Sequence, residues 1–127
     1  MSWRWIDRRA LELLHDESLA LHGGASGLRD EGLLESALAR PLNLAAYGSP
    51  EVWERAASYG VGLAKNHAFV DGNERAAFLA VGLSLALNGY RLTAPQADAT
   101  LTMLAVAAGQ MDEAALARWL RQHSQRR

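Results

Sequence analysis

The residues best suited to chemistry lie together in positions 67–75, which read His-Ala-Phe-Val-Asp-Gly-Asn-Glu-Arg. These nine positions hold an imidazole, two carboxylates, an amide and a guanidinium, and the most hydrophobic stretch of the chain follows directly. If that stretch is a helix, its start carries backbone N–H groups without partners and a partial positive charge, which together attract anions. The segment therefore indicates a site for a phosphate-bearing substrate rather than a simple turn.

Each polar side chain of this segment has a chemistry that suits a phosphate. His67 can act as a general base, because a neutral imidazole can take the proton of an attacking hydroxyl near neutral pH. Asp71 can hold Mg²⁺, although an Asp at this position also serves commonly as a helix N-cap. Gly72 lets a phosphate approach the backbone closely, and Arg75 can bond two phosphate oxygens at once. Asn73 can either donate its amide to phosphate or fix the loop. Together these groups favour phosphoryl or nucleotidyl transfer.

Four neighbouring residues have supporting or open roles. Phe69 is the apolar residue between the polar ones that can anchor the loop to the core. Glu74 fits an acid that is favourable in the first turn of a helix. Lys65 and Asn66 can add a charge or a loop bond, and a solvated face explains them equally well.

Composition bounds the class of protein. The 127 residues are half apolar, which suffices for one domain with a core. Thirteen basic and fourteen acidic residues give a net charge of −1, so we expect no direct nucleic-acid binding. The chain has no cysteine, which excludes disulfides and is compatible with the cytoplasm, where we expect the protein. No signal-like run is present, and the longest apolar stretch, 76–87, is shorter than the roughly 20 residues of a membrane span, so we expect no membrane partner.

Capping and breaking signals predict an all-α bundle of about six helices around a buried central helix at about 73–88. Pro41 is expected to end the second helix, with a loop at 41–49, and Ser49-Pro50 to open the third. The tail 126–127 is expected to fray. His15 and His22 lie seven apart with no evident third ligand, and we expect both on the surface. The six helices are expected to run from their start signals to their stop signals at residues 7 to 23, 30 to 41, 49–51 onward, 72–73 to 88, 95 to 109, and 112 to about 123.

Segment 67–75 resembles the signature of the Fic/Doc family, His-x-Phe-x-Asp/Glu-Gly-Asn-Gly/Lys-Arg, at six defined positions. The chain length and the region 14–37 resemble the short Doc branch, the toxins of death-on-curing toxin–antitoxin modules. The likeness covers most of the chain. It implies one Fic/Doc domain over residues 1–127 with the Fic fold.

The resemblance also implies roles for residues and partners. It makes His67 the base, Asp71 the Mg²⁺ ligand, and Gly72, Asn73 and Arg75 the phosphate binders. It implies Mg²⁺ and a nucleoside triphosphate, ATP, as co-substrate, and a flap within 25–44 that holds a segment of the target protein. Doc-branch proteins phosphorylate a hydroxyl on a component of the translation machinery, whereas most Fic relatives transfer AMP. Fic enzymes that restrain themselves carry a Ser/Thr-x-x-x-Glu-Gly/Asn helix, which this sequence does not match, so we expect inhibition in trans by a small Phd-like antitoxin.

Two positions depart from the family pattern. Position 74 is Glu, where adenylylating relatives have Gly and the Doc branch usually has Lys. A carboxylate beside a triphosphate is repulsive unless a metal or Arg75 bridges them. Phe78 stands where many adenylylating relatives carry a second arginine, which favours the Doc-like reaction. Three readings follow: a Doc-like kinase of Ser/Thr hydroxyls, a nucleotidyl transferase, and a catalytically impaired binding or regulatory module because of Glu74.

Overall fold

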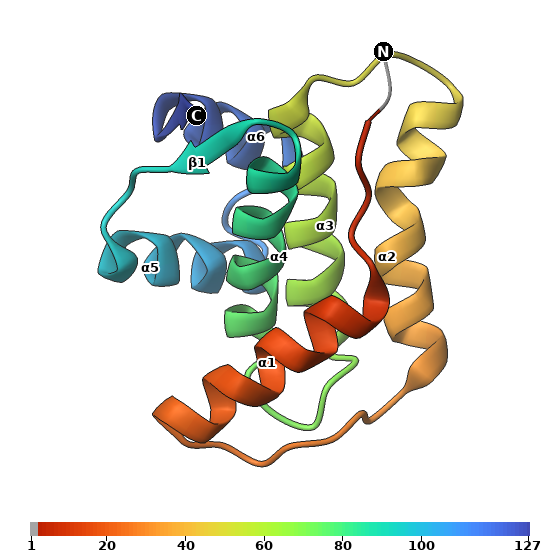
Figure 1. The fold of residues 1–127 in the computed structure, drawn as a ribbon, viewed down its shortest axis with the longest axis vertical. Coiled ribbons are helices and arrows are strands. Elements are labelled where there is room, and N and C mark those ends of the chain that lie inside the picture. The colour runs from red at the N-terminus through yellow and green to blue at the C-terminus, as the bar shows by residue number, and fades with distance from the viewer. Residues whose placement is uncertain (1–2) are drawn as a thin grey trace.

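Six helices and one short two-stranded sheet make up residues 3–127, the part of the chain that this computed structural model describes (Figure 1). The fold is therefore the expected all-α bundle, with a small sheet added. None of the helices within residues 3–127 is long and apolar enough to span a membrane. The helices are α1 (Arg8–His22), α2 (Glu31–Ala46), α3 (Val52–Asn66), α4 (Asn73–Leu87), α5 (Gln96–Ala107) and α6 (Glu113–Gln122), and the strands are β1 (Tyr90–Leu92) and β2 (Ser124–Arg126).

Three helices begin where an aspartate satisfies the first free backbone N–H groups. Asp7 accepts from the N–H of Ala10, Asp30 from that of Leu33, and Asp112 from that of Ala115, at 3.2, 3.0 and 2.8 Å. These side-chain oxygens replace the carbonyl partners that a helix start lacks. The predicted starts of α1, α2 and α6 are confirmed.

The prediction that Pro41 ends the second helix is wrong. Helix α2 continues through Pro41 to Ala46, so most of the expected loop at 41–49 is helical. A proline inside a helix removes one hydrogen bond and costs about 3 kcal/mol. Pro41 is fully buried, and α2 lies close against α3, where a Cβ on Gly62 would come within 3.2 Å of Ala37. Packing against α3 offsets the lost hydrogen bond.

Helix α3 also begins later than Ser49-Pro50 predicted. Its N-cap is Glu51, whose N–H donates to the side chain of Glu54 at 2.8 Å, while the Glu51 side chain caps the helix in return. This reciprocal capping box fixes the start at Val52.

The centre of the bundle is shared by α3 and α4, and α3 is the more deeply buried. Every residue from Arg55 to Ala64 is buried. At Gly60 the backbone of α3 comes so close to its neighbours that a Cβ would lie 2.9 Å from Val81 of α4. Helix α4, the expected central helix, is buried on one face, whereas Phe78 and Leu83 on the other face are half-exposed. Small residues let neighbouring helices pack closely around α3, whereas one face of α4 remains half-exposed.

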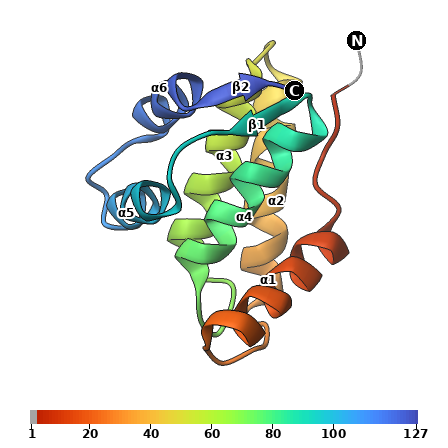
Figure 2. The same cartoon turned by 60° about the vertical axis from the view of Figure 1, so that its left-hand side comes forward.

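The two strands hold the C-terminal tail. Strand β1 pairs with β2 in antiparallel register, with Tyr90 opposite Arg126 and Leu92 opposite Ser124 (Figure 2). The N–H of Arg127 donates to the carbonyl of Gly89 at 2.8 Å. The expected fraying of 126–127 is therefore wrong, because these residues pair with a segment more than thirty positions earlier.

Candidate active site

The nine-residue motif forms the loop between α3 and α4 and the first turn of α4, at the end of the bundle crossed by α1 and the segment that joins α1 to α2 (Figures 1 and 2). His67 is the C-cap of α3 and takes the left-handed conformation, with φ 52° and ψ 48°. It is the one non-glycine residue with positive φ within residues 3–127. This conformation costs about 1–2 kcal/mol and persists only where neighbours hold it. The side chain is exposed, so a substrate could reach it.

Arg29 holds the backbone on which His67 sits. Its Nε donates to the carbonyl of His67 at 2.7 Å and its Nη2 to that of Asn66 at 3.3 Å. These are carbonyls that a helix end leaves without partners. No sequence pattern predicts this role of Arg29, because its partners are backbone oxygens that any residue would supply.

The segment around Arg29 also pairs with the motif loop. The backbone N–H groups of Arg29 and Asp30 both donate to the carbonyl of Ala68, at 2.8 and 3.0 Å. The N–H of Val70 donates to Gly27 at 3.0 Å. Residues 27–30, part of the expected flap region 25–44, therefore run alongside the motif, whereas most of the rest of that region belongs to α2.

Phe69 and Asn73 fix the loop from within. Phe69 is 5% exposed and packs on the ring of His15, with ring centroids 4.3 Å apart, so its side chain anchors the loop to the core. Asn73 is buried as well. Its Oδ1 accepts from the Phe69 N–H at 3.0 Å, and its Nδ2 donates to the Phe69 carbonyl at 3.1 Å. Of the two roles that the sequence left open for the Asn73 side chain, the structure shows loop fixing.

The expectation that His15 lies on the surface is wrong. His15 is 1% exposed, and its Nε2 lies 2.9 Å from the backbone oxygen of Asp71. His22, in contrast, is exposed as expected. The helical spacing of the two histidines could not separate them, because the partner of His15 lies 56 positions further along the chain.

Asp71 and Gly72 lead into α4. The Asp71 carboxylate is exposed, and its oxygens accept from the N–H of Gly72 at 2.8 Å and from that of Ala25 at 3.2 Å. Gly72, with φ 71°, is the N-cap, so Asp71 lies one position before it. No cap bond from a side chain closes the start of α4. The N-terminal backbone of this helix is therefore available to an anion.

The residues present fit a magnesium ion that arrives with a polyphosphate. Within residues 3–127 no group of three or more His, Cys, Asp or Glu side chains could enclose a metal. Mg²⁺ usually keeps several waters and binds through one or two carboxylates together with substrate phosphates. A lone exposed carboxylate beside a helix N-terminus, as Asp71 supplies, matches that pattern.

The remaining residues in and next to the motif differ in the contacts that their side chains make. Glu74 and Arg75 are half-buried, and neither forms an ion pair with any residue the structure describes. Arg75 therefore has its guanidinium free for oxygen anions, and the charge of Glu74 is not neutralised by a neighbour. Asn66 makes a loop bond to the carbonyl of Leu33 at 2.9 Å, whereas Lys65 is exposed.

An apolar groove of about 580 Å³ begins at Arg75. It lies between α1 and the half-exposed face of α4, and Leu14, Leu21, Phe78 and Leu83 are among its walls. An open apolar surface of this kind commonly marks a binding site.

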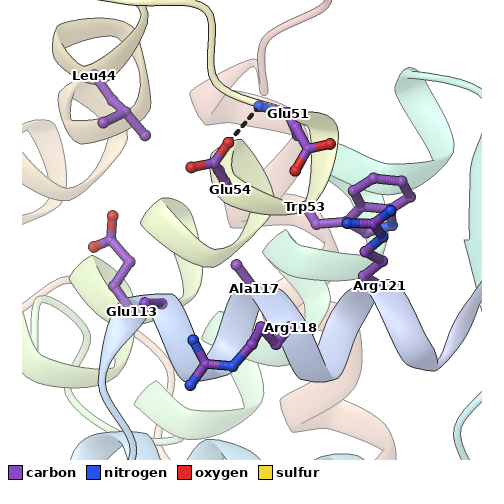
Figure 3. A pocket seen from close by; sticks show the side chains of 9 residues that line it. Leu44, Glu51, Trp53, Glu54, Glu113, Ala117, Arg118 and Arg121 are labelled. Carbon is purple, nitrogen blue, oxygen red and sulfur yellow. Dashed lines mark hydrogen bonds between the residues drawn. The ribbon is translucent and has the colours of Figure 1, made fainter.

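A second cleft, of about 460 Å³, lies at the opposite end of α3, between its N-terminus and α6 (Figure 3). The rise of a helix of this length separates it from the motif loop by about 22 Å. Three of its charged groups have partners: the guanidinium of Arg121 lies 5.2 Å from the Trp53 ring, Glu54 caps α3, and Glu113 pairs with Arg40. It is not part of the candidate active site.

Comparisons with known proteins find one matching family and two similar proteins. The sequence profile of the Fic/DOC family matches residues 5–85, which include the whole motif loop. The chain is 42% identical over 93 residues to the Toxin Doc of Mycolicibacterium smegmatis, covering 71% of this chain and 68% of that protein. It is 33% identical over 119 residues to the Protein kinase doc of Escherichia phage P1, covering 93% of this chain and 94% of that protein.

Proposed function

Because this chain belongs to the Fic/Doc family, we propose that it is a Doc-like toxin that transfers the terminal phosphate of ATP to a Ser or Thr hydroxyl of a target protein. The observation that carries this proposal is the exposed His67 side chain, which lies in the loop that leads into α4, whose start has no side-chain cap. A base and an anion site are the two parts that phosphoryl transfer needs side by side. The resemblance to the Doc branch makes a component of the translation machinery the proposed target.

The proposed reaction uses each motif residue in one role. His67 takes the proton of the attacking hydroxyl, whose oxygen forms a bond to the terminal phosphorus while the bond from that phosphorus to the leaving nucleoside diphosphate breaks. Arg75 and the backbone N–H of Asn73 bind phosphate oxygens, and Gly72, which has no side chain, lets the phosphate approach the backbone. Asp71 would hold Mg²⁺, which when bound neutralises charge on the phosphates.

Two other outcomes remain as candidates. Transfer of AMP by the same site is the first, although Phe78 places an apolar ring on the groove wall where many adenylylating relatives carry arginine. The second is an impaired binding module, which Glu74 supports because its carboxylate forms no ion pair within residues 3–127. A repulsive charge in the first turn of α4 opposes a triphosphate there.

Labelled ATP separates these candidates. The purified protein is incubated with γ-labelled or α-labelled ATP, Mg²⁺ and a bacterial lysate, and label is followed into protein. Label from the γ position alone supports the kinase, and label from the α position supports AMP transfer. His67→Ala must abolish the signal, and Leu101→Ala, which changes an exposed residue of α5 outside the motif and the groove, must keep it.

If neither label is transferred by the folded protein, the kinase proposal fails and Glu74→Lys becomes the decisive variant. Lys is the residue that the Doc branch usually has there, and it replaces the repulsive charge with an attractive one. Transfer that appears only in Glu74→Lys identifies the natural protein as the impaired module.

We also propose that a Phd-like antitoxin inhibits the protein in trans and binds in the groove that begins at Arg75. The apolar walls suit one face of an amphipathic helix, and a partner seated there would cover the free guanidinium. Phe78→Asp should abolish co-purification of the antitoxin encoded next to this protein, whereas Leu101→Asp, on an exposed residue of α5 outside the groove, should not. If both variants co-purify the antitoxin equally, the antitoxin binds outside this groove.

A further inference from the structure

The buried side chain of His15, in α1, makes a hydrogen bond to the motif loop and to no other described residue. Its Nε2 lies 2.9 Å from the carbonyl oxygen of Asp71. A carbonyl only accepts, so Nε2 carries a hydrogen and donates it. The other ring nitrogen, Nδ1, is buried and has no hydrogen-bond partner among the described residues. An unpaired buried nitrogen is unfavourable, so an apolar residue would fill this space at less cost. Packing alone does not explain a histidine here.

The peptide that His15 holds joins the two parts of the proposed phosphate site. On one side of it stands the Asp71 carboxylate. On the other side stands Gly72, whose N–H donates to that carboxylate and whose carbonyl accepts from Ala76 at 2.9 Å, at the start of α4. Rotation of this one peptide would therefore move the carboxylate and the helix start apart.

Two further contacts make the position of the ring well defined. Phe69 packs on one side of it at 4.3 Å between centroids. Gly72 lies so close that a Cβ there would stand 3.0 Å from Cε1 of His15. The ring thus touches the loop before and after Asp71, and at Asp71 it makes the hydrogen bond.

We propose that His15 is a positioning residue that fixes the Asp71–Gly72 peptide, so that the Asp71 carboxylate and the N-terminus of α4 face the same magnesium-bound polyphosphate. This inference rests on the proposed function. At 1% exposure His15 cannot touch substrate itself, and it acts through the carbonyl that it holds.

Three variants test the hydrogen bond separately from the packing. In His15→Gln the amide nitrogen can take the place of Nε2 and donate to Asp71. His15→Asn has the same amide on a side chain one carbon shorter, which does not reach. His15→Leu fills the space without any donor. Thermal unfolding of all three establishes that they are folded before they are compared.

The first readout needs no catalysis. Amide hydrogen exchange at Gly72 and Ala76, followed by NMR without nucleotide, should match the natural protein in His15→Gln and be faster in His15→Leu and His15→Asn. The second is calorimetric binding of Mg-ATP, which should weaken about tenfold or more in His15→Leu and His15→Asn and recover in His15→Gln, the size typical when a residue that orients a metal ligand is lost.

The third readout is phosphate transfer, in which the Mg²⁺ concentration for half-maximal rate should rise in the same two variants. Natural-like exchange and Mg-ATP binding in His15→Leu would overturn the inference, as would a folded His15→Gln that behaves like His15→Leu. If the natural protein transfers no phosphate, the proposed function fails, while exchange and Mg-ATP binding still decide the role of His15.

Discussion

Replacing Gly72 by alanine tests how tightly the start of α4 is built against α1. Gly72 has φ 71°, and a Cβ there would lie 3.0 Å from Cε1 of His15 and 3.2 Å from Cδ2 of Leu19. A non-glycine residue in the left-handed region costs about 1–2 kcal/mol. Forcing an extra methyl against buried neighbours adds about 1–2 kcal/mol, since His15 is held on both sides and cannot move away freely. We expect Gly72→Ala to lower the free energy of unfolding by about 2–4 kcal/mol.

Two other glycines separate these contributions. Gly89 has φ 90° but open space around its Cβ position, so Gly89→Ala should show the backbone cost alone, about 1–2 kcal/mol. Gly82 lies within α4, also with open space, and Gly82→Ala should stabilise the protein by about 0.5–1 kcal/mol. Gly89→Ala therefore isolates the cost of the left-handed backbone. The difference between Gly72→Ala and Gly89→Ala measures the cost of the close contact.

Thermal and urea unfolding followed by circular dichroism measure these differences. For a domain of this size, 1 kcal/mol shifts the melting temperature by about 4 °C, so Gly72→Ala should melt about 8–16 °C lower and Gly89→Ala about 4–8 °C lower. If Gly72→Ala is no less stable than Gly89→Ala, the close contact with His15 does not constrain the loop and the reasoning is wrong.

Three further predictions follow from the same contacts. Asn73→Ala leaves the buried N–H and carbonyl of Phe69 without partners, and urea unfolding should show a loss of about 2–4 kcal/mol; a loss near zero would mean that water replaces the amide. Arg29→Ala frees the carbonyl of His67 and should lower kcat of phosphate transfer about tenfold with little change in stability, whereas an unchanged kcat would remove Arg29 from the site. Burial raises the pKa of Tyr59 above its ordinary value of 10.0, so the unfolded chain loses this proton first and stability should fall as pH rises above 10.0. Absorbance titration should show one tyrosine that ionises late and is absent from Tyr59→Phe; identical titration curves would contradict the burial argument.

The sequence by itself determined the all-α class, the starts of three helices and the identity of the motif. Asp7, Asp30 and Asp112 cap helices whose first N–H groups lie three positions away, so the signal and its partner occur in the same short segment. The motif residues 67–75 are likewise contiguous, and their types alone predicted a base next to an anion site. Such local interactions are visible in a sequence because the chain cannot separate their members.

Only the tertiary structure decided what surrounds that motif. His15 lies in the interior because its ring bonds the carbonyl of Asp71, and the backbone of His67 is fixed by Arg29. Helix α2 continues through Pro41 because this residue is buried against α3. The pairing of the tail with β1 is of the same kind. In each case the free energy comes from a partner far along the chain, and many arrangements of the same helices would have satisfied the local pattern equally well. The sequence therefore specified which groups could do the chemistry, and long-range packing specified where they stand.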